Sequence, residues 1–284
     1  MTDQSAAFAD KADASLQPLF YQDPQLLHGE LHASWRLCDG DAAFAAETPY
    51  VPIVAGEMAS AARSYPIVFA AHDAQPVVIL GLERRNLFVA DGRWADDAYV
   101  PAYVRRYPFG FIATVNPDGF ALAIDTKADR VVRSGEEGVA LFEDAKPSDI
   151  TRQALAFCDA FQGDAMATRA FGDALKKQGL LVDRRADATL PDGRTLGLDG
   201  FQIVDAGKFG ELADDVVLDW HKKGWLALVH FHFASLERFR LLLSRQAAAA
   251  PVATMSQAGG SALEAGSAPG AVPAKDSKAK KVAS

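Results

Sequence analysis

The chain has 284 residues, 49% of them hydrophobic, and a formal net charge of −8. This length and apolar content allow one large buried core, whereas the acidic balance excludes general nucleic-acid binding, which needs a basic surface. No apolar stretch reaches the roughly 20 residues of a membrane-spanning helix, so the sequence predicts no membrane span and excludes a membrane permease.

The N-terminus and the cysteines bear on where the protein works. Residues 1–18 are polar and acidic and lack the apolar segment of a secretory signal, so we expect a disordered leader there. Cys38 and Cys158 lie far apart and in different contexts, which indicates two reduced thiols. These observations predict a cytoplasmic protein and leave a signal-independent export route open.

Prolines divide the first third of the chain into short elements. The pattern predicts a strand around 34–37, a short alanine-rich helix over 55–63 and a strand over 67–70. Two further strands are expected over 77–82 and 86–89. This succession favours an antiparallel meander over βαβ units.

The stretch 98–112, AYVPAYVRRYPFGFI, concentrates aromatic side chains around a pair of arginines. Pro101 suits the first turn of a helix, and the residue before Pro108 is pushed out of the helical region. We therefore expect a two-turn helix over 101–107, followed by a strand over 109–115.

Two hairpins and a long helical segment come next. The turn signals NPDG at 116–119 and PDGR at 191–194 each predict a hairpin. The hairpin strands are expected at 109–115 with 120–124, and at 180–190 with 195–204. Between the hairpins lie an irregular connection, 125–147, and helical spacing over 148–180 that fits one kinked helix or two in series.

The C-terminal third predicts a helix over 208–222, a strand over 225–233 (WLALVHFHF) and a helix over 236–246. Residues 247–284 hold almost no large apolar side chain, so we expect a disordered tail of Ala, Gly, Ser, Pro and Lys. The whole pattern predicts one α+β domain over 19–246, with mostly antiparallel strands and hairpins and several packed helices.

Arg105 and Arg106, together with Tyr103 and Tyr107, suggest an anion-binding patch that Arg63 joins. Arginine forks match carboxylate and phosphate groups. The alternative is that the arginines are half-buried and hold loop carbonyls and tyrosine rings together. Two more residues, Tyr99 and Arg36, are candidate members of the patch.

His230 and His232 suggest a second kind of site. On the predicted strand, residues two apart point to the same face, and such a pair presents two imidazoles to a metal ion such as Zn or Fe. A third ligand would be His221, Asp219 or Asp199. The alternative is that these histidines are half-buried and hydrogen-bonded to their neighbours. No nucleophile elbow, P-loop or dinucleotide fingerprint occurs in the sequence.

Three parts of the chain together resemble one family. They are FAAETPYVPIVAGEMASAARSYPIVFA (44–70), NLFVADGRWADDAYVPAYVRRYPFGF (86–111), and LPDGRTLGLDGFQIVD (190–205) leading into WLALVHFHFASLERFRLLLSRQ (225–246). These blocks are similar to the SapC family, bacterial proteins named for an association with surface-array (S-layer) proteins. A peptide-transport permease of the same name is unrelated and needs membrane spans. The resemblance covers roughly residues 20 to 246, and it offers no catalytic residues that could be assigned to this chain.

We therefore expect a soluble, non-enzymatic SapC-family protein without a cofactor. The resemblance implies a binding or accessory role in cell-surface protein production or in envelope uptake systems. The expected partner is a small anionic ligand or a protein. One alternative is a metal-dependent oxygenase or hydrolase that holds Fe or Zn on the histidine pair. The other is a structural subunit of a surface layer.

Overall fold

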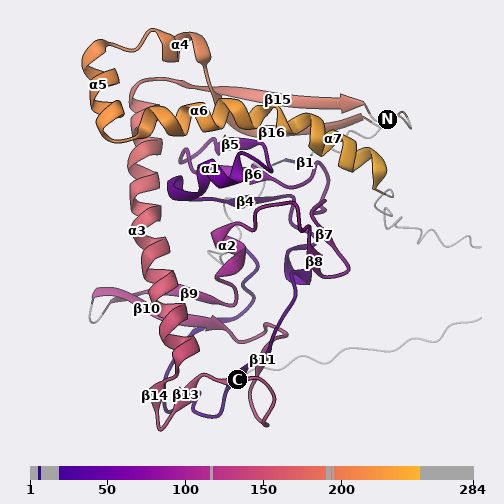
Figure 1. Cartoon of the computed structure of the whole chain (residues 1–284), viewed down its shortest axis with the longest axis vertical. Helices are drawn as coiled ribbons and strands as arrows, with labels where there is room; N and C mark the ends of the chain where they lie inside the picture. Colours follow the sequence, from indigo (N-terminus) through magenta and orange to yellow (C-terminus); the bar gives the residue numbers. More distant parts are fainter. Residues whose placement is uncertain (1–5, 8–18, 116–117, 190–192, 194, 250–284) are drawn as a thin grey trace, which may run out of the picture. The chain divides into compact units, whose positions relative to one another are not determined.

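The computed structural model describes residues 6–7, 19–115, 118–189, 193 and 195–249 (Figure 1). The expected leader, apart from Ala6–Ala7, and the expected tail from residue 250 onward lie outside this range, as do parts of both predicted turns. Helices pack against mostly antiparallel sheets, which confirms the predicted α+β class. None of the helices in the described part is both long and apolar enough to cross a membrane.

The largest sheet combines strands from both halves of the chain. Its order is β1–β16–β5–β6–β4, and β15 also pairs with β16. The bounds are Ala6–Ala7 for β1, Tyr50–Pro52 for β4, Ile67–Ala70 for β5, Pro76–Ile79 for β6, Leu181–Thr189 for β15 and Thr195–Val204 for β16. Only β1, among these described strands, runs parallel to its partner. The predicted strand over 67–70 and the predicted second hairpin are confirmed.

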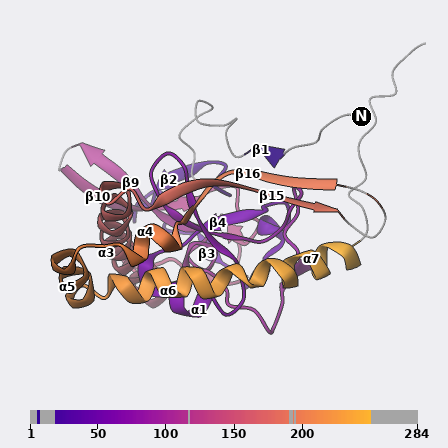
Figure 2. The same ribbon diagram turned by 90° about the horizontal axis from the view of Figure 1, so that it is seen from above.

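Two helices, α6 (Trp225–Leu236) and α7 (Arg238–Ala248), follow one another along one side of this sheet (Figure 2). The predicted strand over 225–233 is therefore wrong. Its residues are apolar at nearly every position, so they show neither the strand period nor the helix period. In α6 the buried side chains are Val229, His232 and Ser235, which recur at helical spacing.

The long helix α3 (Asp149–Lys177) is continuous, which decides between the one-helix and two-helix interpretations. It contacts the short 3-10 helix η2 (Ala55–Glu57) and strand β9 (Phe109–Val115), which belongs to a second sheet. The predicted helix over 208–222 is divided into α4 (Ala206–Gly210) and α5 (Asp214–Lys222).

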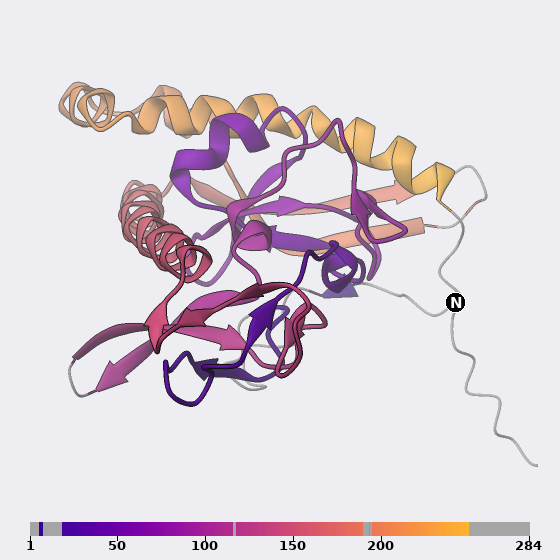
Figure 3. The same ribbon diagram turned by 60° about the horizontal axis from the view of Figure 1, so that its bottom comes forward.

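A second sheet has the order β2–β10–β9 and lies on the opposite side of the main sheet from α6 and α7 (Figure 3). Its strands are β2 (Pro24–Leu26), β9 (Phe109–Val115) and β10 (Asp118–Asp125). The pairing of β9 with β10 is antiparallel and confirms the first predicted hairpin. A smaller sheet, β11–β3–β12, brings the 36–37 segment between two later strands.

The remaining elements are short. They are η1 (Ala43–Ala45), α1 (Met58–Ala61), α2 (Ala102–Arg105), β3 (Arg36–Leu37), β7 (Val89–Ala90), β8 (Arg93–Trp94), β11 (Val131–Val132), β12 (Val139–Ala140), β13 (Phe142–Glu143) and β14 (Lys146–Pro147). The helix predicted over 55–63 is thus η2 followed by α1, and the helix predicted over 101–107 is a single turn. The main hydrophobic core includes Tyr65, Phe69 and Phe171. It packs α1 against α3 and the main sheet.

Candidate functional site

Arg105 and Arg106 are consecutive, and the structure gives them different surroundings. The exposed Arg105 donates from Nε to the carbonyl of Val100 (3.0 Å) and from Nη2 to the hydroxyl of Tyr99 (3.0 Å). Its guanidinium also lies over the ring of Phe157, 5.3 Å from the centroid. These contacts orient the side chain and leave part of its charge exposed to solvent.

The guanidinium of Arg106 is packed among aromatic rings. It lies 4.2 Å from the ring centroid of Tyr103, 4.6 Å from that of Phe161 and 5.7 Å from that of Tyr21. Its Nε is buried and has no hydrogen-bond partner in the described part of the chain. These cation–π contacts hold the guanidinium among the rings.

Tyr107 connects the aromatic stack to the second sheet. Its ring stacks on Phe44 with centroids 4.2 Å apart, and its hydroxyl donates to the carboxylate of Asp125 (3.1 Å). Asp125 is fully buried and also accepts from the backbone N–H groups of Gln22 and Asp23. Burial, with Asp125 beside the phenol, raises the pKa of Tyr107 above its usual value.

Arg105 and Tyr107 line the same cavity, which we call the arginine cavity. Its volume is about 440 Å³. The lining residues are Gly40, Asp41, Ala42, Phe44, Gly92, Arg93, Trp94, Asp96, Val100, Val104, Arg105, Tyr107 and Arg130. An adjoining cavity of about 720 Å³ shares five of these residues. Three chain segments therefore bring three arginines and three aromatic rings to one site.

Three arginines line the cavity, Arg93, Arg105 and Arg130. None of the ion pairs found in the described part of the chain involves any of them. Arg130 donates from Nε to the carbonyl of Cys38 (3.1 Å). Two carboxylates, Asp41 and Asp96, also belong to the lining.

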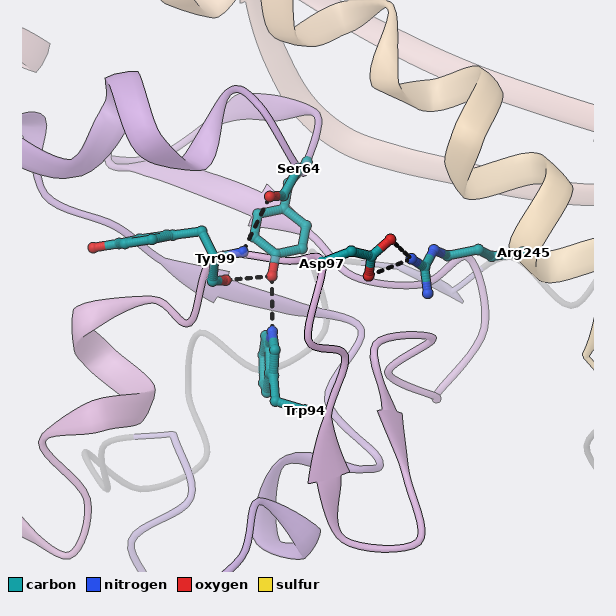
Figure 4. Close-up of polar contacts among 6 residues, drawn as sticks. Ser64, Trp94, Asp97, Tyr99 and Arg245 are labelled. Atoms are coloured by element: carbon teal, nitrogen blue, oxygen red, sulfur yellow. Dashed lines mark hydrogen bonds and ion pairs between the residues drawn. The ribbon is translucent and has the colours of Figure 1, made fainter.

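A polar network holds the segment before α2 in place (Figure 4). The indole N–H of Trp94 donates to the hydroxyl of Tyr65 (2.9 Å), which in turn donates to the carbonyl of Tyr99. The N–H of Tyr99 donates to the hydroxyl of Ser64 (3.1 Å). Since Trp94 lines the cavity and Tyr99 orients Arg105, this network positions one wall of the site.

Arg63 and Arg36, which the sequence suggested as further members of the patch, do not line the arginine cavity. Arg63 is exposed and is not among the residues that line the arginine cavity. Arg36 donates from Nε and Nη2 to the carbonyl of Gly138, at 3.0 and 2.8 Å. It joins β3 to the loop before β12.

The histidine pair does not share a face, because the predicted strand is a helix. On a helix, residues two apart point about 200° away from each other. His230 is exposed and His232 is fully buried. The Nδ1–H of His232 donates to the carbonyl of Ile67 (2.8 Å), and Nε2 accepts from the N–H of Val204 (3.1 Å).

Both ring nitrogens of His232 are therefore occupied by hydrogen bonds, one to Ile67 on β5 and one to Val204 on β16. Burial lowers the pKa of His232 to about 4. His221 is exposed near the end of α5. In the described ranges, no three His, Cys, Asp or Glu side chains are grouped as a metal site would need.

The sequence patterns did not single out one buried acidic residue, Glu57. Glu57 ends η2 and is only 6% exposed. Its carboxylate accepts from the N–H of Ala102, at 3.4 and 3.2 Å to the two oxygens. Burial raises the pKa of Glu57 to about 7. A sequence signal for its burial is its position as a single glutamate among mostly apolar residues in VAGEMASA (54–61).

The architecture and the cavity define a class: an α+β protein with an arginine-lined cavity formed by the η1 segment, the β7–β8 pair, the α2 segment and Arg130. The family model described as SapC matches residues 27–242. The chain belongs to the SapC family, as its sequence blocks suggested. No curated protein and no solved structure matches it.

Proposed function

We propose that the protein is a non-enzymatic binding protein that holds a small anionic ligand in the arginine cavity. The observation that carries the proposal is the convergence of Arg93, Arg105 and Arg130 on one cavity without ion-pair partners in the described part of the chain. Guanidinium groups bind carboxylate and phosphate through paired N–H donors.

The three arginines converge on one cavity although the chain as a whole is acidic. A chain with a net charge of −8 repels anions at long range. Inside the cavity the lining carries three arginines against Asp41 and Asp96, and Asp41 already accepts from the N–H of Ala43 (2.9 Å). The local balance therefore favours an anion that fits within the cavity over an extended anionic surface.

The aromatic lining suggests the shape of the ligand. Phe44, Trp94 and Tyr107 all contribute to the cavity, and such rings contact planar or apolar parts of a ligand. A carboxylate or phosphate attached to a planar or hydrocarbon body satisfies both the guanidinium groups and the rings. The proposal also includes an accessory role in surface-protein production or envelope uptake. Family membership supports this part of the proposal.

The neighbouring arginines give a matched test on the full chain. Binding of inorganic phosphate and of benzoate is measured by titration in NMR spectra of the protein and of two variants, Arg105→Ala and Arg106→Ala. We expect Arg105→Ala to weaken binding about tenfold or more, because a hydrogen bond to a charged group contributes roughly 1.5–3 kcal/mol, and to leave stability nearly unchanged. Arg106→Ala is expected to lower stability through the loss of three ring contacts.

Two results would contradict the proposal. One is the absence of saturable shifts at the cavity residues with either anion. The other is equal binding to wild type and Arg105→Ala. A third variant, Arg152→Ala, controls for loss of charge, because Arg152 is exposed on α3 and does not line the cavity.

A further inference from the structure

A second pocket is lined by residues of η2, α2 and the middle of α3. Its volume is about 210 Å³, room for roughly seven water molecules at about 30 Å³ each. The lining residues are Val54, Gly56, Glu57, Tyr99, Ala102, Arg105, Phe157, Ala160, Phe161 and Asp164. We call it the Glu57 pocket.

Glu57 is a buried carboxyl group with weak hydrogen bonding. Its sole donor in the described part is the N–H of Ala102, at 3.2 Å from the nearer oxygen, which is at the long end for such bonds. None of the ion pairs found there involves Glu57. A ligand that supplies a positively charged N–H donor stabilises the ionised form of a carboxyl group in this position.

The second carboxylate of the pocket comes from α3. Asp164 is exposed, and its Oδ2 lies against the backbone of η2, 3.3 Å from where a Cβ on Gly56 would be. The hydroxyl of Thr168 fixes this contact, because it accepts from the N–H of Ala55 (2.7 Å) and donates to the carbonyl of Asp164 (2.6 Å). Two carboxylates from different elements therefore border one small space.

The charges of the pocket match a single cation. Glu57 and Asp164 carry two negative charges when ionised, and Arg105 carries one positive charge. Arg105 is directed to the hydroxyl of Tyr99 and the carbonyl of Val100, so it leaves the carboxylates available to another donor. A monovalent cation neutralises the remainder.

We propose that the Glu57 pocket binds the primary ammonium group of a small organic molecule. The carboxylates of Glu57 and Asp164 accept its N–H donors. The rings of Phe157 and Phe161 contact its hydrocarbon part. This site goes beyond the proposed anion binding: Arg105 borders both sites, but Glu57, Asp164, Phe157 and Phe161 do not line the arginine cavity.

The lining favours an organic ammonium over a divalent metal ion. Calcium and magnesium need about six or more oxygen ligands, including water, whereas this pocket offers two carboxylates next to phenylalanine rings and a guanidinium. An ammonium group takes three hydrogen bonds, and its alkyl chain gains from burial against Phe157 and Phe161.

Protonation of Glu57 couples cation binding to pH. The charged and titratable groups around it are Arg105 at the end of α2, Asp164 on α3 and the phenol of Tyr99. Burial raises the pKa of Glu57 to about 7, so the cation competes with a proton below that pH. Affinity for an amine that stays protonated is therefore expected to rise with pH through about 7 and to level off near about pH 8.

The test uses butylammonium as the probe, 1-butanol as its neutral counterpart, and the full chain. We expect butylammonium, and not butanol, to cause saturable NMR shifts at the backbone amides of Glu57, Ala102 and Asp164. Glu57→Gln and Asp164→Asn are each expected to weaken binding about tenfold or more. Asp159→Asn removes the same charge from an exposed site on α3 outside the pocket and should not change it.

A pH series separates this site from a general attraction of cations to an acidic protein. Between about pH 6 and about pH 7 the wild-type affinity should rise about fivefold, and Glu57→Gln should lose this dependence. The proposal is overturned by equal shifts with butanol, by equal weakening in Asp159→Asn, or by Glu57→Gln and Asp164→Asn that both bind as wild type does. Phosphate binding in the Glu57→Gln variant reports on the arginine cavity separately.

Discussion

At the scale of single residues, two buried titratable groups oppose each other in their effect on stability. His232 is neutral in the folded protein because burial lowers its pKa, and Glu57 holds a proton more tightly because burial raises its pKa. Folding therefore excludes a proton from one group and favours a proton on the other. The pH dependence of unfolding contains both effects, and single substitutions separate them.

His232 should make the protein less stable in mild acid. Its pKa is about 4 in the folded state and 6.5 without burial. The unfolded chain thus binds an extra proton between these values, so the stability lost on going from about pH 6.5 to about pH 4 reaches about 3 kcal/mol. Urea unfolding of wild type and His232→Gln across this range measures it. The exposed His230→Gln is the control, and an unchanged pH slope in His232→Gln would show that another group dominates.

Glu57 should have the opposite effect at higher pH. Its pKa rises from 4.5 to about 7 on folding, so the folded state holds the extra proton, and stability falls as pH increases from about 4.5 to about 7. Glu57→Gln keeps an acceptor for the N–H of Ala102 and removes the titration. We expect the variant to exceed wild type in stability at about pH 8 by up to about 3 kcal/mol, as measured by urea unfolding. A variant less stable than wild type at this pH would be inconsistent with a buried, weakly partnered carboxylate.

At the scale of elements, the sequence predicted hairpins well and α6 poorly. The β15–β16 and β9–β10 hairpins were found because Asp-Gly turn signals locate the reversal of the chain independently of the core. The α6 segment carries no turn signal inside it and is apolar on all sides. Its packing against α5, α1, β5 and β16 decides that it is helical, and its contact with β5 joins segments more than 150 positions apart.

The docking of α6 depends on polar contacts that can be tested with one hydroxyl. The hydroxyl of Ser235 accepts from the N–H of Ile67 (2.9 Å) and donates to the carbonyl of His232 (2.6 Å). Ser235→Ala leaves a buried N–H unpaired, so we expect a loss of about 1–3 kcal/mol in unfolding free energy. Ser244→Ala is the matched control, because the Ser244 hydroxyl on α7 is exposed. Equal losses in the two variants would argue against the contact at Ile67.

At the scale of the whole molecule, the arginine cavity is made by segments that lie far apart in sequence. Arg105 and Tyr107 were predicted because both belong to one short aromatic stretch. Arg93 and Arg130 were not, since nothing local marks a residue whose role depends on a neighbour from another strand or loop. Glu57 was missed for a similar reason: its burial comes from α2 and α3, and sequence spacing alone does not show which glutamate folding covers.

The C-terminal helix α7 should stabilise one wall of this cavity. Arg245 on α7 donates to both carboxylate oxygens of Asp97 (3.1 and 3.0 Å; Figure 4). Its guanidinium also lies over the ring of Phe88. Asp97 is two residues before Tyr99, whose hydroxyl orients Arg105. Arg245→Ala should therefore loosen this segment and increase the hydrogen-exchange rate of the Tyr99 amide about tenfold, with the β5 amides unchanged. Arg240→Ala, which removes a solvent-exposed arginine from the same helix, is the control. If the Tyr99 amide exchanges at the wild-type rate in Arg245→Ala, then α7 covers the sheet without stabilising the cavity wall.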